Sequence, residues 1–262
     1  MHEIFIALSV TLLAGLATVI GGILVLFFKQ PSYRVMAFGL AFSAGAMIYV
    51  SLTEILTKSV DSFSHSVVSE QAFALGTAAF FVGMIAIILL DRFIPNPHIM
   101  LEDTANKLDP RKLNRVGMLT LFAITAHNLP EGLATFFATL ESPTLGAPLA
   151  VAIAIHNIPE GIAIALPVYM ATQSKKSAFI ATFISGLAEP VGAILGYAVL
   201  APIMSDLVYG WVFGIIGGVM VFLALDELLP TAKQFAQGHE TVYGLVSGMG
   251  VLAFSLVLLN FV

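Results

Sequence analysis

Long runs of apolar residues alternate with short polar joints along the whole chain of 262 residues. Each run is long enough to cross a bilayer, which takes roughly 20 residues when the segment is a helix. Most of the charged residues fall between the runs rather than within them. The pattern predicts eight spans, at approximately 4–28, 35–56, 72–94, 116–138, 147–171, 177–200, 207–229 and 241–262.

These runs predict helices rather than strands. The strands of a membrane barrel alternate polar and apolar residues, and the runs show no such alternation. A helix satisfies its own backbone hydrogen bonds inside lipid, where no water is available. We therefore expect an all-α polytopic membrane protein that forms a single transmembrane domain over residues 1–262.

The composition excludes several other classes of protein. Hydrophobic residues make up 58% of the chain and charged residues only 10%, whereas about a quarter of a soluble domain is charged. So few charges cannot coat a water-soluble enzyme, and the net charge of −5 gives no sign of nucleic-acid binding. Because the chain has no cysteine, a metal site cannot use thiolate ligands and must rely chiefly on nitrogen and oxygen.

The basic residues lie mostly on one side of the eight-span arrangement. They fall in the joints after spans 1, 3, 5 and 7, and only Lys58 falls on the other side. The positive-inside rule therefore places the basic side in the cytoplasm and both termini outside it. The longest joint, about 95–115, contains two proline breakers and is predicted to be a cytoplasmic loop.

Ionisable side chains near the middle of the predicted spans indicate the chemistry. Apart from tyrosines they are His127, Glu131, His156, Glu160 and Glu189. A carboxylate at the bilayer centre costs at least about 2.5–3.5 kcal/mol, and no lysine or arginine lies at that depth. The neutralising charge must therefore come from protons or from a bound cation.

Four of these residues occur in a repeated string. The chain reads His-Asn-Leu-Pro-Glu-Gly at 127–132 and His-Asn-Ile-Pro-Glu-Gly at 156–161. In each copy the His and Asn lie four and three residues before the Glu, so the three side chains share one helix face. The proline leaves a backbone carbonyl without its usual donor, which is tolerable at membrane depth in a protected cavity.

The repetition also predicts a symmetry. Consecutive spans run antiparallel, so the doubled string implies a pseudo-two-fold axis in the membrane plane, as in inverted-repeat transporters with a site at the midplane. A weaker echo relates Glu54 in span 2 to Asp226 and Glu227 in span 7. Because these spans run in opposite directions, Glu54 is a candidate entry acid, and Asp226 and Glu227 are candidate exit acids.

The ligand types narrow the choice of metal. Imidazole combined with carboxylate suits Zn²⁺ and other divalent first-row ions, whereas Mg²⁺ and Ca²⁺ prefer oxygen ligands. Three buried carboxylates are compatible with one or two divalent ions. Met47 in span 2 is a candidate further ligand, although packing is the commoner role of such a thioether.

These motifs resemble the ZIP (Zrt/Irt-like) family of divalent-metal transporters over essentially the whole chain. The doubled string carries the resemblance, together with Gly-Leu-Ala-Glu-Pro at 186–190 and Asp-Glu-Leu-Leu-Pro at 226–230. The resemblance implies a protein of the bacterial inner membrane with a three-plus-two-plus-three arrangement of helices. In that arrangement spans 1–3 and 6–8 form the inverted repeat.

The resemblance further implies a binuclear metal centre on spans 4–6. One site is formed by His127, Glu131, His156 and Glu160, with Met47 as a candidate ligand. The second site is formed by Asn128, Asn157 and Glu189, with Glu131 and Glu160 bridging the two ions.

We therefore expect an importer of divalent metal ions rather than an enzyme, with Zn²⁺ preferred and Fe²⁺, Mn²⁺, Co²⁺ or Cd²⁺ as further substrates. The alternative is a proton channel or proton-driven transporter that uses the same carboxylates. An intramembrane metalloprotease would need a His-Glu-x-x-His helix, which the chain lacks. The expected partners are the metal ions and the lipid bilayer, not nucleic acid; a homodimer stays open.

Overall fold

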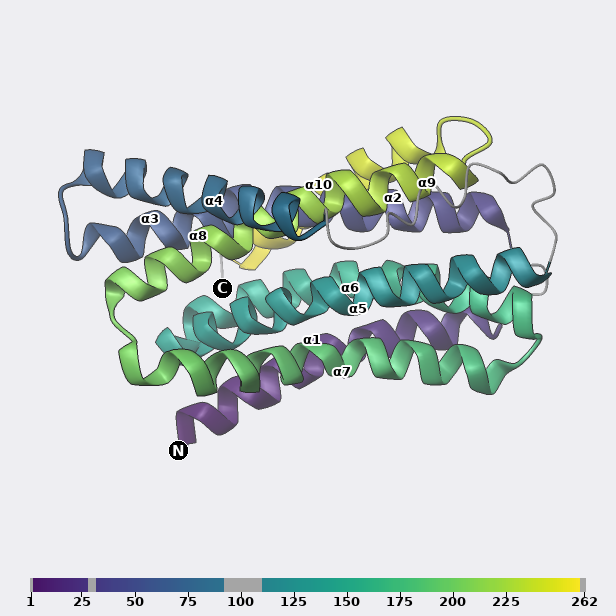
Figure 1. The fold of residues 1–262 in the computed structure, drawn as a ribbon, viewed down its shortest axis with the longest axis horizontal. Coiled ribbons are helices and arrows are strands. Elements are labelled where there is room, and N and C mark those ends of the chain that lie inside the picture. Colours follow the sequence, from purple (N-terminus) through teal and green to yellow (C-terminus); the bar gives the residue numbers. More distant parts are fainter. Residues whose placement is uncertain (1, 28–31, 92–109, 260–262) are drawn as a thin grey trace.

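The structure consists of long helices joined by short turns (Figure 1). The computed structural model describes residues 2–27, 32–91 and 110–259. Within these ranges the description leaves out the side chains of Asp91, His127, Leu259 and residues 110–117, 119, 120, 123 and 143–145. No strand occurs in the described ranges.

Most helices coincide with a predicted span, and the second and seventh spans each comprise three consecutive segments. The α-helices are α1 (His2–Val25), α2 (Tyr33–Val50), α3 (Leu56–Ser64), α4 (Ser69–Asp91), α5 (Pro110–Glu141), α6 (Pro143–Thr172), α7 (Lys175–Leu200), α8 (Asp206–Leu223), α9 (Leu229–Phe235) and α10 (Glu240–Leu259). Two π-helical segments, η1 (Ser51–Ile55) and η3 (Ala224–Leu228), join α2 to α3 and α8 to α9. A short 3₁₀ segment, η2 (Ala201–Ile203), ends the sixth span.

The lengths of these helices suit a membrane protein. Seven helices of the described part are long and apolar enough to cross a bilayer. α5 has 32 residues and lies where the fourth span is predicted. The all-helical polytopic fold is therefore confirmed.

Three helix limits differ most from the predicted ones. The seventh span continues through η3 and α9 to Phe235, beyond the predicted end at residue 229. The second span continues as a helix to Ser64, beyond the predicted end at residue 56, because η1 carries the helix through Glu54 without a break. Residues 110–115 of the predicted cytoplasmic loop belong to α5, since Pro110 suits the first turn of a helix. The rest of that predicted loop lies outside the described residues.

The helices form two bundles that lie side by side (Figure 1). In one bundle, α1 and α5 each pack against both α6 and α7. In the other, α2 packs against α10 and α4 against α8. Along the chain the order is still three, two and three spans, but in space the first span of each repeat joins the central pair. We call these the inner bundle (α1, α5, α6, α7) and the outer bundle (α2–α4, α8–α10).

Close helix contacts repeat with the predicted pseudo-two-fold symmetry. Gly161 of α6 lies against the carbonyl oxygen of Thr18 in α1, and Gly132 of α5 lies against that of Glu189 in α7. Glycine allows such backbone approach because it has no Cβ. The contact of Gly21 with the carbonyl oxygen of Ile158 corresponds in the same way to that of Gly192 with Leu129. In the outer bundle, the contact of Gly45 with the carbonyl oxygen of Leu245 corresponds to that of Gly218 with Phe80.

The glycine contacts give a test of the packing. A Cβ on Gly83 of α4 would strike the backbone carbonyl of Ile215 in α8, whereas a Cβ on Gly250 of α10 would meet nothing within 4 Å. We expect Gly83→Ala to destabilise the protein by about 1–3 kcal/mol, because backbone cannot yield as a side chain does. Gly250→Ala is the matched control and should be neutral or stabilise by up to about 1 kcal/mol. Thermal unfolding in detergent measures both, and equal midpoints would contradict the packing.

Candidate metal centre

The two repeated strings lie in adjacent helices of the inner bundle. α5 runs through Pro130 and α6 through Pro159 without a break, and the two helices pack along their length. Only Ser142 separates α5 from α6, so the helices run in opposite directions. The strings therefore meet near the middle of the bundle, as the symmetry of the sequence predicts.

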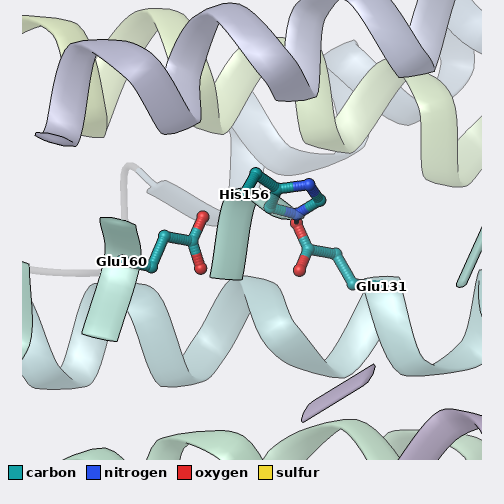
Figure 2. Close-up of side chains that lie close together, drawn as sticks. All are labelled: Glu131, His156 and Glu160. Carbon is teal, nitrogen blue, oxygen red and sulfur yellow. Dashed lines mark hydrogen bonds and ion pairs between the residues drawn. The ribbon is translucent and has the colours of Figure 1, made fainter. Parts of the chain in front are cut away.

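Three predicted ligands form one cluster. Glu131 of α5 and His156 and Glu160 of α6 each offer a ligand atom within 4.8 Å of the others. All three side chains are completely buried. Figure 2 shows the two carboxylates pointing toward each other, and the imidazole of His156 lies beside the carboxylate of Glu131. The arrangement has the composition and spacing needed to hold a metal ion.

The imidazole of His156 is oriented by its other nitrogen. Nδ1 lies 3.1 Å from the carbonyl oxygen of Ala152. A carbonyl can only accept, so Nδ1 carries a proton in this contact. Nε2 of the neutral ring is then an acceptor, and it lies 3.2 Å from Oε1 of Glu131. Two acceptors this close require a proton or a cation between them, and Nε2 is the nitrogen that faces the candidate ion.

The second set of predicted ligands surrounds this cluster. Asn128, Asn157 and Glu189 are completely buried. Asn157 donates through Nδ2 to Oε1 of Glu189, which brings α7 into the centre. It also donates to the carbonyl oxygen of Ala14 in α1, at 3.0 Å. The centre is thus built from α5, α6 and α7, with α1 fixing one of its amides.

The two asparagine amides are held in equivalent ways. Nδ2 of Asn128 donates to the carbonyl oxygen and the hydroxyl of Ser185, at 3.1 and 3.3 Å. Because the nitrogens of Asn128 and Asn157 are both engaged, their oxygens are left for another partner. Within the described part of the chain, no hydrogen bond reaches Oδ1 of either residue, Oε2 of Glu131 or Oε2 of Glu189. Buried oxygens in such a state are suited to a cation.

The predicted ligands also include His127 and Met47. The side chain of His127 lies outside the described residues. Met47 is completely buried in α2 of the outer bundle. One turn earlier in α2, Ser43 donates its hydroxyl to the carbonyl oxygen of His156 at 3.0 Å, so this face of α2 is against the centre. Met47 therefore remains a candidate ligand.

The candidate entry and exit acids are not members of the three-residue cluster. Glu54 is partly buried in η1, and Asp226 and Glu227 are partly buried in η3. Both segments are π-helical, so spans 2 and 7 correspond in backbone conformation as well as in sequence. π-Bulges re-aim side chains within a helix and occur often at functional sites.

Sequence reasoning missed the residues that orient the ligands. Ser43 donates to the backbone carbonyl of His156, whereas Ser185 and the Ala14 carbonyl accept from the side-chain amides of Asn128 and Asn157. A signal was present in the sequence. Residues 11–18 read Thr-Leu-Leu-Ala-Gly-Leu-Ala-Thr, and residues 182–189 read Thr-Phe-Ile-Ser-Gly-Leu-Ala-Glu. This echo relates Ala14 to Ser185, and α1 to α7.

The fold and the centre define a polytopic helical membrane protein with a buried cluster able to hold a metal ion. The family described as "ZIP Zinc transporter" matches residues 95–256 of the chain. Proteins named "Zinc transporter ZupT" align over nearly the full length of both chains. That of Stenotrophomonas maltophilia (strain R551-3) is 64% identical over 260 residues, covering 98% of this chain and 97% of the relative.

More distant relatives show the same full-length match. The "Zinc transporter ZupT" of Neisseria meningitidis serogroup B is 59% identical over 268 residues, covering 100% of this chain and 98% of the relative. That of Chlorobaculum parvum is 47% identical over 264 residues, covering 98% of each. The chain belongs to the ZIP family. Membership confirms the resemblance read from the motifs, and it places the chain among transporters rather than enzymes.

The contact between Asn157 and Glu189 gives a test of the centre. Asn157→Leu removes the amide that donates to the buried carboxylate, so the metal-free protein should lose about 1–3 kcal/mol of stability. Adding Glu189→Met should recover part of this loss, because no carboxylate is then left without a donor. Thermal unfolding of the metal-free proteins in detergent measures the coupling between the two sites. Additive losses in the double variant would contradict the contact.

Proposed function

We propose that this protein imports divalent metal cations, zinc first, across the bacterial inner membrane. One observation carries the proposal: Glu131, His156 and Glu160 are buried together with their ligand atoms within 4.8 Å of one another. A buried group of two carboxylates and one imidazole is stable at membrane depth when a divalent cation balances its charge.

The proposed centre holds two ions. One ion binds His127, Glu131, His156 and Glu160, with Met47 as a candidate ligand, and the other binds Asn128, Asn157 and Glu189. Glu131 and Glu160 bridge the two. The free oxygens of Asn128, Asn157, Glu131 and Glu189 support this division, because each buried oxygen needs a positive partner.

Zn²⁺ is proposed as the preferred substrate for two reasons. The mixture of imidazole and carboxylate suits Zn²⁺ better than it suits Mg²⁺ or Ca²⁺. The relatives that align over their full length are named zinc transporters. Fe²⁺, Mn²⁺, Co²⁺ and Cd²⁺ accept the same ligand types and are proposed as further substrates.

The proposed path crosses the junction between the two bundles. Glu54 attracts the ion at the outer mouth, and Asp226 and Glu227 receive it at the inner mouth. Alternating access requires one repeat-built unit to move against another around a fixed site. The contacts between bundles are uneven: α2 is hydrogen-bonded to α6 through Ser43, while an apolar cavity of about 350 Å³ lies between α8 and the pair α5 and α7. A junction of this kind can be rearranged without dismantling either bundle.

Flux through the centre is tested with purified protein in liposomes. The native protein should take up Zn²⁺, and Glu131→Ala or Glu160→Ala should lower the initial rate by more than about tenfold, because each removes a ligand. Glu70→Ala alters an exposed acid at the start of α4 and is the matched control. Zinc uptake at the native rate by either centre variant would contradict the proposal.

The same liposomes separate metal transport from the alternative. A proton channel would acidify them under a pH gradient without any metal, and its flux would not respond to added Zn²⁺. The importer instead requires that the metal-free protein be stabilised when Zn²⁺ is added. Proton flux with neither zinc uptake nor zinc-dependent stabilisation would favour the proton channel.

The orientation is tested with single cysteines, because the chain has none of its own. Ser66 between α3 and α4 and Lys176 at the start of α7 are both exposed. If both termini lie outside the cytoplasm, a membrane-impermeant maleimide added to intact cells should label Ser66→Cys and spare Lys176→Cys until the cells are opened. The reverse labelling pattern would mean that the transporter is oriented the other way.

A further inference from the structure

The hydroxyl of Thr18 in α1 is buried without a hydrogen bond in the described part of the chain. Thr18 has 0% exposure, and its Oγ1 has no partner among the described residues. The usual acceptor of a helical threonine is the carbonyl four residues earlier. Thr11 of the same helix makes this bond to Ala7 at 2.9 Å. For Thr18 the equivalent carbonyl, that of Ala14, is engaged by Asn157.

Thr18 also packs against both α6 and α7, which carry residues of the metal centre. Its carbonyl is packed against Gly161, the residue that follows Glu160 in α6. A Cβ built on Gly186 of α7 would lie 3.6 Å from Cβ of Thr18. The side chain is therefore enclosed between α6 and α7, the two helices that supply His156, Asn157, Glu160 and Glu189.

The inverted repeat makes Thr18 the counterpart of Glu189. Gly-Leu-Ala-Thr at 15–18 corresponds to Gly-Leu-Ala-Glu at 186–189. The contacts correspond as well: Glu189 has its carbonyl against Gly132 and its Cδ 3.3 Å from a Cβ built on Gly15. The Glu189 side chain passes α1 at Gly15 and reaches Asn157. The equivalent path from Thr18 passes α7 at Gly186 and leads toward Asn128.

We propose that Thr18 is a specificity-determining residue of the centre, whose hydroxyl oxygen is a neutral ligand for the metal on the side of Asn128. The assignment rests on the proposed function, since it gives the transported ion a further donor. A hydroxyl here supplies an oxygen where the repeat would otherwise place a fourth carboxylate. It raises the number of oxygen donors without adding negative charge, which favours metal ions that accept more than four ligands.

The test compares three variants of the full chain. Thr18→Val keeps the shape and removes the hydroxyl, Thr18→Ser keeps the hydroxyl, and Thr11→Val removes a satisfied hydroxyl from the same helix. In liposomes, Thr18→Val should raise the KM for Zn²⁺ about tenfold, as expected for loss of one group around a metal. Thr18→Ser should stay within about threefold of the native KM by the same measure, and Thr11→Val should match the native protein.

Thermal unfolding with and without Zn²⁺ separates binding from folding. Metal-free Thr18→Val should be at least as stable as the native protein, because a buried hydroxyl without a described partner makes no bond and costs desolvation energy, but Zn²⁺ should raise its midpoint less. A native KM and a native zinc-dependent shift in Thr18→Val would overturn the assignment. So would equal effects of Thr18→Val and Thr18→Ser, since the hydroxyl that Thr18→Ser keeps would then make no difference. If the native protein binds Zn²⁺ without transporting it, the proposed function fails, and the unfolding shifts still decide the role of Thr18.

Discussion

The contact between Nε2 of His156 and Oε1 of Glu131 is the interaction on which the rest of the structure depends. The Ala152 carbonyl fixes the proton of the imidazole on Nδ1, so a lone pair faces a carboxylate at 3.2 Å with Glu160 close by. The sequence places no lysine or arginine in the spans that carry these residues. A buried site of this kind is stable only with positive charge inside it, and a mobile dication or a proton can supply that charge.

The helix packing serves this site. Glycine contacts bring the backbones of α1 and α6, and of α7 and α5, close enough for a side-chain amide to reach the carbonyl of a neighbouring helix. Asn157 uses the carbonyl of Ala14 and Asn128 that of Ser185. Because both nitrogens are held, both amide oxygens have a fixed direction. The packing thus decides which atom of each asparagine a cation would meet.

Much of this could be predicted from the sequence, and the limits have physical causes. The number of spans and the midplane residues follow from length and charge alone. The partners of each helix do not, because in lipid every face of a span is apolar and the pattern does not mark the buried one. The spacing of His156 and Glu160 predicts that they share a face, but the side chain that the imidazole of His156 contacts at 3.2 Å is Glu131 of the other string. Contacts of that kind depend on how two helices approach, which no single helix encodes.

The asymmetry of the centre is as informative as its symmetry. The repeat duplicates the backbone contacts, the asparagines and the carboxylates of Glu131 and Glu160, yet only α7 adds a third carboxylate, while α1 has Thr18. If the centre holds two dications, as proposed, four carboxylates would neutralise them completely, whereas three would leave a net positive charge. A transporter has to release what it binds. A site that an ion enters readily, but in which two ions repel each other slightly, is therefore better suited to passage than a fully neutralised site. On the proposed function, a hydroxyl at Thr18 in place of a fourth carboxylate would therefore favour release of the ion over its retention.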